Sequence, residues 1–189
     1  MSKFFKRLTD FLVSGTALIG FSPVFLALAA AIKLDSRGPV IFKQNRIGLN
    51  GRLFEIYKFR TMHFGTPDLP TDQMLKLPSP ITTVGSFLRK TSLDELPQLL
   101  NVLKGEMSLV GPRPALYNQT ELTAMRQAAG VLDFTPGITG WAQINGRDEL
   151  ADSVKVEADK WYCDHWNYWL DWQIIFSTFG AVVSKRGAF

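Results

Sequence analysis

The stretch TSLDELPQLLNVLKGEMSLVGPRP, residues 91–114, combines a helical pattern of apolar residues with closely spaced acidic and basic side chains. Two adjacent carboxylates, Asp94 and Glu95, stand at the start of the apolar pattern, and Arg113 follows between two prolines. A carboxylate can attack or deprotonate, while a rigidly held guanidinium can bind two phosphate oxygens at once. The stretch therefore favours phosphoryl chemistry.

The same stretch predicts a helix over residues 93–103, because leucines at 93, 96, 99, 100 and 103 share one helical face. Pro97 fits only if the helix begins within a few residues before it, which places Asp94 in or beside the first turn. Ser92-x-x-Glu95 is also a capping-box pattern, so both acids have a purely structural interpretation as cap residues. The two interpretations are compatible, since a helix start also attracts phosphate.

Outward from this stretch the sequence predicts one mainly helical α/β domain with a small β-hairpin. Strand-like residues 40–42 and 53–59 flank a segment with Asn-Gly turn chemistry. The polar, proline-rich residues 63–80 predict a surface loop. Helices are expected over residues 84–89, 118–129, 152–162 and 168–183, and turns over residues 136–140 and 145–147.

The composition argues against a dedicated nucleic-acid-binding protein, a disulfide-stabilised protein and a zinc protein. A net charge of +4 does not require a nucleic-acid partner, and it suits an anionic membrane face or a phosphorylated substrate. The single cysteine, Cys163, rules out an internal disulfide and favours a reducing, cytosolic setting. The two histidines, His63 and His165, have no zinc-binding spacing.

Residues 11–32 form an apolar run without a charge, which reaches the roughly 20 residues of a membrane-spanning helix. A signal peptide is a weaker reading, because the run is long for an h-region. Ser22-Pro23 at its middle disfavours a straight helix, and basic residues flank both ends, so both ends favour the cytoplasm. A helix that breaks at Ser22-Pro23 and returns satisfies both flanks, with the Ser22 hydroxyl meeting freed backbone groups. From these residues alone, the spanning and re-entrant readings stay open.

The C-terminal region is dense in amphipathic aromatic residues, which is typical of a helix at the level of lipid headgroups. A buried aromatic core is an equally good reading. The residues concerned are Trp161, Tyr162, Trp166, Tyr168, Trp169 and Trp172.

Other charged residues are weaker site candidates. Each of the cations Arg89, Arg147, Lys58 and Arg60 could join Arg113 in binding phosphate, although each alone is more simply a solvated charge. The acids Glu106 and Asp159 could help hold Mg²⁺, a cation that prefers oxygen ligands and is usually shared with substrate phosphates. Neither acid has a diagnostic spacing.

Five motifs in order give the chain a resemblance to a known family. They are GPVIF (residues 38–42), KFRTM (58–62), SLDELPQ (92–98), GPRP (111–114) and PGITG (136–140). With them the chain resembles the bacterial sugar transferase family, the small monotopic phosphoglycosyl transferases, over nearly its whole length.

The resemblance implies an enzyme that moves a sugar 1-phosphate from a UDP-sugar to undecaprenyl phosphate and releases UMP, starting a polysaccharide such as O-antigen or exopolysaccharide, or another glycoconjugate. It implies Asp94 as the nucleophile that forms a covalent phosphosugar intermediate and contacts Mg²⁺, Glu95 as its acid/base partner, and Arg113 as the phosphate-binding residue. Lys58, Arg60, Arg89 and Arg147 would be weaker phosphate-binding candidates.

The resemblance also implies an organisation and a location. Residues 1–34 would be a re-entrant anchor broken at Ser22-Pro23, and residues 35–189 the catalytic domain with interfacial amphipathic helices. The chain would lie on the cytoplasmic face of the bacterial inner membrane and would contact membrane lipids. It would bind no nucleic acid, and a homodimer is one possible assembly.

Two rival hypotheses are a non-catalytic membrane-associated scaffold, in which Asp94 and Glu95 only cap a helix, and a glycosidase with paired carboxylates. The glycosidase mechanism places its acids on opposite sides of a sugar bond, roughly 5 Å or more apart. Adjacent residues reach that arrangement less naturally. The sequence does not identify the sugar.

Overall fold

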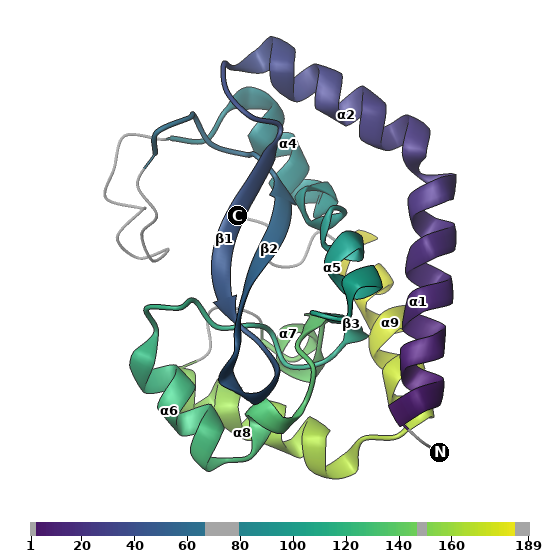
Figure 1. Cartoon of the computed structure of the whole chain (residues 1–189), viewed down its shortest axis with the longest axis vertical. Coiled ribbons are helices and arrows are strands. Elements are labelled where there is room, and N and C mark those ends of the chain that lie inside the picture. Colours follow the sequence, from purple (N-terminus) through teal and green to yellow (C-terminus); the bar gives the residue numbers. More distant parts are fainter. Residues whose placement is uncertain (1–2, 67–79, 147–150, 184–189) are drawn as a thin grey trace.

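The structure, a computed structural model, describes residues 3–66, 80–146 and 151–183. Two helices, α1 (Lys3–Gly20) and α2 (Ser22–Asp35), form a bent arm along one side of the molecule, with 62° between them (Figure 1). Pro23 lies in the first turn of α2, where a missing N–H is tolerated. The Ser22 hydroxyl donates to the carbonyl of Ile19 at 2.7 Å. The predicted break and the predicted role of Ser22 are confirmed.

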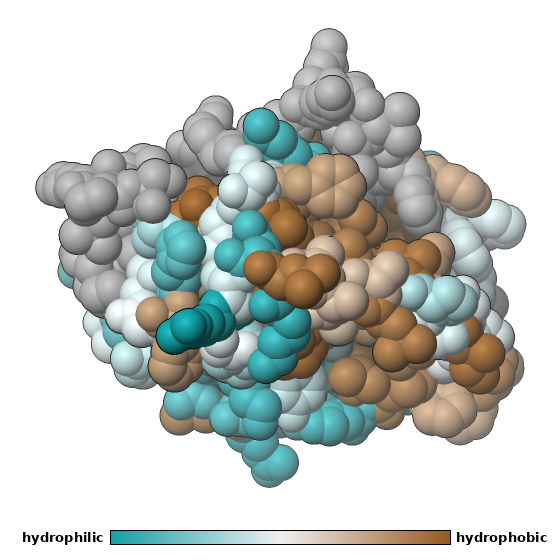
Figure 2. Space-filling model, turned by 90° about the horizontal axis from the view of Figure 1, so that it is seen from above, coloured by the Kyte–Doolittle hydropathy of each residue, from teal (hydrophilic) through white to brown (hydrophobic). Residues whose placement is uncertain are grey.

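Within the described residues, no single helix combines the length and apolarity needed to cross a bilayer. Taken together, α1 and α2 meet that requirement by length and composition. Their exposed side chains include Ile19, Leu26 and Leu34. Figure 2 shows hydrophobic residues gathered on the side where α1 and α2 lie in Figure 1, with hydrophilic residues opposite. The re-entrant arrangement and the boundary between residues 34 and 35 stay predictions.

The predicted hairpin is confirmed, with a longer first strand. β1 (Ile41–Ile47) pairs antiparallel with β2 (Leu53–Phe59) along its whole length. The turn is confined to the 3₁₀ segment η1 (Leu49–Gly51) and its neighbours, because Asn50 (φ 54°) and Gly51 (φ 73°) take the left-handed backbone that reverses the chain.

The predicted helix over residues 93–103 begins later than expected. After α4 (Thr83–Thr91), which confirms the helix expected over residues 84–89, the chain forms a single 3₁₀ turn, η2 (Leu93–Glu95). The α-helix α5 spans Gln98–Lys104. Pro97 has no N–H to donate into a preceding turn, so α5 begins directly after it. Asp94 and Glu95 therefore lie in the 3₁₀ turn between two helices.

The turn expected at residues 136–140 is wrong, because these residues include a short strand. β4 (Gly137–Thr139) runs parallel to β3 (Ser108–Val110), immediately before the GPRP motif. The two segments approach closely, and a Cβ on Gly137 would lie 2.1 Å from the backbone nitrogen of Gly111. Glycine at both positions permits this pairing, which fixes the start of the GPRP motif.

Helices close the base and flank of the molecule. α6 (Thr120–Ala128), stopped by Gly130 at φ 72°, and α8 (Asp152–His165) lie below the hairpin, and α9 (Tyr168–Val183) lies along α1 (Figure 1). These three confirm the helices expected over residues 118–129, 152–162 and 168–183. The remaining short elements are η3 (Val131–Asp133) and α7 (Trp141–Ile144).

Some aromatic residues of α8 and α9 fit a buried aromatic core, and others fit a helix at the level of the lipid headgroups. Tyr162 is buried in a core with Val110, Leu170 and Ile174. Trp169, in contrast, is 76% exposed, as an interfacial side chain would be. Neither reading covers the whole set.

Candidate active site

Glu95 lies between two cations from distant parts of the chain. Lys58 Nζ, near the end of β2, donates to Glu95 Oε1 at 2.8 Å. Arg113 Nη2, from the GPRP motif, donates to the same oxygen at 3.1 Å. Burial would raise the pKa of Glu95, but the two cations outweigh it and hold that pKa well below its ordinary value. Glu95 is therefore ionised at neutral pH.

Asp94, the adjacent residue, has the opposite electrostatic balance. Burial raises the pKa of its half-buried carboxyl, and the charge of Lys58 offsets part of this rise. The negative charge of Glu95 adds to the rise, whereas Arg89 and Arg113 oppose it. A carboxylate that is poorly solvated and surrounded by cations is a reactive nucleophile toward an anionic phosphorus centre.

The capping-box interpretation of these acids is wrong. Ser92 has φ 56° and closes α4, its N–H donating to the carbonyl of Arg89 at 3.2 Å. Its side chain makes no cap hydrogen bond at the start of η2. Glu95 directs its carboxylate to Lys58 and Arg113 instead.

The other predicted cations separate into different places. Arg89, at the end of α4, contributes to the charge around Asp94 and donates from Nε to Thr61 Oγ1 at 3.0 Å. Arg60 is buried, and its guanidinium donates to the carbonyls of Ser36 and Arg37, just after α2. The structure thus gives Arg60 a role in holding the end of the arm. Arg147 lies outside the described residues.

The two additional acids have other partners. Glu106 Oε2 accepts from Asn101 Nδ2 at 2.7 Å. Asp159 Oδ2 accepts from Arg126 Nη2 at 2.6 Å, in a pair that is almost entirely buried. Arg126 in turn donates from Nη1 to the carbonyl of Arg113 at 2.6 Å. Sequence reasoning missed Arg126, because one arginine within a polar helical stretch carries no local signal.

Among the described residues, no group of three or more His, Cys, Asp or Glu side chains could hold a metal ion. Asp94 nevertheless fits the chemistry of Mg²⁺, which takes one or two carboxylates and completes its shell with water and substrate phosphates. Glu95 is less suited, since Lys58 and Arg113 both occupy Oε1. In the part of the chain that the structure describes, Asp94 is therefore the candidate ligand for a metal ion that would be shared with a bound substrate.

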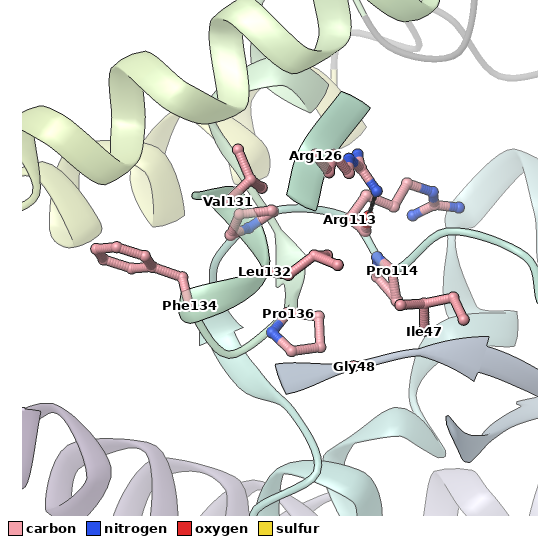
Figure 3. Close-up of a pocket in the computed structure, with 10 residues that line it drawn as sticks. Ile47, Gly48, Arg113, Pro114, Arg126, Val131, Leu132, Phe134 and Pro136 are labelled. Atoms are coloured by element: carbon pink, nitrogen blue, oxygen red, sulfur yellow. Dashed lines mark hydrogen bonds between the residues drawn. The ribbon is translucent and has the colours of Figure 1, made fainter. Parts of the chain in front are cut away.

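A small cavity lies behind Arg113, between the GPRP motif and the segment around η3. Figure 3 shows Arg113 and Arg126 on one side of it and Phe134 and Pro136 on the other. Its apolar lining includes Ile47, Val131 and Leu132. Pro112, Arg113 and Pro114 of the GPRP motif therefore share this cavity with residues of η3 and of the turn that follows it.

The comparisons with known proteins agree on one family. The family model described as bacterial sugar transferase matches residues 1–185. The undecaprenyl-phosphate glucose phosphotransferase of Komagataeibacter xylinus is 43% identical, over 97% of this chain and 37% of that protein. The undecaprenyl-phosphate galactose phosphotransferase of Salmonella typhimurium is 39% identical, over 100% of this chain and 42% of that protein.

A shorter relative matches over most of its length. The Bacillus subtilis protein named uncharacterized sugar transferase EpsL is 45% identical, over 96% of this chain and 89% of that protein. This chain therefore spans about two fifths of the two phosphotransferases and nearly all of EpsL.

Proposed function

Because the chain belongs to the bacterial sugar transferase family, we propose that it transfers a sugar 1-phosphate from a UDP-sugar to undecaprenyl phosphate and releases UMP. The names of its relatives support the acceptor, and they differ between glucose and galactose in the transferred sugar. The observation that carries the proposal is the cluster in which Asp94 adjoins Glu95, with Lys58 and Arg113 bound to the latter.

The reaction would proceed in two displacements at one phosphorus atom. A carboxylate oxygen of Asp94 attacks the β-phosphorus of the UDP-sugar, and the bond to the bridging oxygen breaks, so UMP leaves with that oxygen. An oxygen of undecaprenyl phosphate then attacks the same phosphorus and displaces Asp94, which regenerates the carboxylate and yields a sugar linked to the lipid through a diphosphate. A covalent intermediate divides one difficult displacement into two easier ones.

The surrounding charges have distinct parts in this proposal. Arg113, with its planar fork of donors, would bind phosphate oxygens, and Lys58 and Arg89 would offset the charge on the transferred group. The lowered pKa of Glu95 favours a role in holding Lys58 and Arg113 over a role as proton donor. Mg²⁺, when bound at Asp94 together with the substrate, would supply further neutralisation of the diphosphate.

The test is UMP release from a panel of UDP-sugars, with undecaprenyl phosphate in detergent, and with and without Mg²⁺. Release with one or a few donors that requires the lipid phosphate for full turnover would support the proposal and identify the sugar. Loss of UMP release when Mg²⁺ is removed would support a requirement of the reaction for this metal. If no donor in a panel that includes UDP-glucose and UDP-galactose yields UMP, the proposal fails.

The pH dependence of the reaction tests the electrostatics of Asp94. Activity should fall as pH drops through the raised pKa of Asp94, because only the ionised carboxylate attacks. Lys58→Met should move the acidic limb of the kcat/KM profile to higher pH, since Lys58 lowers that pKa. Lys160→Met, at an exposed lysine paired with Asp164, is the control. An acidic limb that does not move in Lys58→Met would contradict the assigned influence of Lys58.

We further propose that residues 1–34 form a re-entrant anchor that holds the catalytic domain at the cytoplasmic face of the inner membrane. The bend at Phe21–Pro23 and the basic residues at both flanks support this arrangement. In a Cys163→Ser background, single cysteines introduced at Lys3 and at Lys33 should both be labelled from the cytoplasmic side. Labelling of the two positions from opposite sides would show that the arm spans the membrane.

A further inference from the structure

Three consecutive carbonyl oxygens of the GPRP motif are each held by a different part of the molecule. The carbonyl of Pro112 accepts from the N–H of Gly137 at 3.0 Å, in β4. The carbonyl of Arg113 accepts from Arg126 at 2.6 Å, and that of Pro114 from Arg46 Nη1 at 3.1 Å. The backbone around Arg113 is thus fixed through its acceptors, while the two prolines have no N–H to contribute.

Arg126 is the contact that reaches Arg113 itself. Figure 3 shows its guanidinium beside the backbone of Arg113, joined to it by the hydrogen bond. The other guanidinium nitrogen, Nη2, donates to Asp159 of α8 at 2.6 Å. The side chains of Arg126 and Asp159 are only 5% and 2% exposed. The planar guanidinium therefore links α8 to the site through one rigid group.

Stability alone is a weak explanation for this pair. Burying two charges carries a desolvation cost, which their attraction offsets only when the geometry is good. A pair of apolar residues of similar size often gives a fold that is equally stable or more stable. An apolar side chain at position 126, however, could not donate to the carbonyl of Arg113. The pair therefore makes a directional hydrogen bond to the backbone that apolar packing could not replace.

We propose that Arg126 and Asp159 are positioning residues for Arg113: Asp159 orients the guanidinium of Arg126, and Arg126 holds the Arg113 carbonyl so that the Arg113 side chain faces Glu95. This inference rests on the proposed function, in which Arg113 binds the diphosphate of the donor. Asp159 would thus affect phosphate binding indirectly, through Arg126 and Arg113. It would contact neither a metal nor the substrate.

Activity of two variants tests the chain of contacts. Asp159→Asn keeps the shape of the side chain and removes its charge, and Arg126→Lys keeps the charge and removes the fork. Each should lower kcat/KM by about 10- to 100-fold, because small misplacements of a binding group have effects of this size. Asp164→Asn, in an exposed pair on the same helix, is the matched control and should retain wild-type activity.

A double-mutant cycle distinguishes positioning from general structural damage. In an Arg113→Ala background, Asp159→Asn and Arg126→Lys should reduce kcat/KM by less than about twofold, since the group they position is already gone. If either variant costs as much in that background as in the wild type, the positioning role is overturned. Arg126→Lys keeps the test available should Asp159→Asn fail to fold.

Hydrogen–deuterium exchange separates this inference from the proposed function. Amides in residues 111–116 should exchange faster in Asp159→Asn than in the wild type, and Asp164→Asn should leave them unchanged. Equal exchange in Asp159→Asn and the wild type would overturn the positioning role, whatever the activity. A wild-type chain that releases no UMP while these amides respond would refute the proposed reaction and leave the structural link between Asp159 and Arg113 supported.

Discussion

Replacing Asp94 by Asn is expected to reduce UMP release by roughly 10⁴-fold or more, the scale seen when a covalent nucleophile is removed. The amide keeps the size of the side chain but cannot form the bond to phosphorus. Because Asp94 lies in the 3₁₀ turn η2, and its neighbour Glu95 makes the ion pairs there, the fold should survive the change. The measurement is the initial rate of UMP release with the active donor.

Intact-mass spectrometry provides the second part of this experiment. Wild-type protein mixed with the UDP-sugar in the absence of lipid should gain the mass of one phosphosugar, and Asp94→Asn should gain none. Asp133→Asn, in the separate segment η3, is a control for loss of an acid and should behave as the wild type. An adduct that persists in Asp94→Asn would place the nucleophile elsewhere, and full activity without an adduct would favour a direct displacement.

Replacing Asp171 by Ala is expected to destabilise the fold by about 3–5 kcal/mol, because it leaves the partly buried ammonium of Lys6 and two further donors without their shared partner. Asp171 is buried and accepts from Lys6 Nζ at 2.6 Å, from the Tyr162 hydroxyl at 2.7 Å and from Trp166 Nε1 at 3.2 Å. These contacts tie α1 to α8 and α9. Urea unfolding followed by tryptophan fluorescence, in a fixed detergent, measures the change.

A control at an exposed ion pair sets the scale. Asp164→Ala removes an exposed partner of Lys160 and should cost less than about 1 kcal/mol. Combining Lys6→Met with Asp171→Leu should recover part of the loss, because an uncompensated buried charge is then avoided. Equal stability of Asp171→Ala and Asp164→Ala would show that the link between α1 and the body carries little of the folding free energy.

The apolar pattern of residues 11–32 does not reveal how the arm formed by α1 and α2 is attached to the rest of the molecule. In addition to Lys6, Arg7 donates to the carbonyls of Val102 and Leu103, at the end of α5. Asp10 accepts from the N–H of Leu109, at 3.1 Å, in the strand that leads to the GPRP motif. The charged start of α1 is therefore packed against the elements that carry the site.

Local patterns in the sequence were sufficient to predict the individual helices and strands. The hairpin, the helices over residues 84–89, 118–129, 152–162 and 168–183, and the break at Ser22-Pro23 all follow from periodicity, from glycine and proline, and from side chains acting on their own backbone. The pairing of Asp94 with Glu95 is equally local, since adjacent residues must share a turn. The membership of the family follows from motifs in order along the chain.

Which charged side chains form pairs, in contrast, became known only from the fold. Lys58 and Arg113 converge on Glu95, whereas Arg60, two residues beyond Lys58, turns to the end of α2. The same holds for the PGITG motif, in which residues 137–139 form a strand beside β3, and the close approach of Gly137 to Gly111 leaves no room for a side chain at either position. Local patterns specify the conformation of a segment, but the partner of a long charged side chain depends on which segments the core brings together. Most of the candidate residues could therefore be named from the sequence, but Arg126 could not, and the division of all of them into site, support and anchor required the fold.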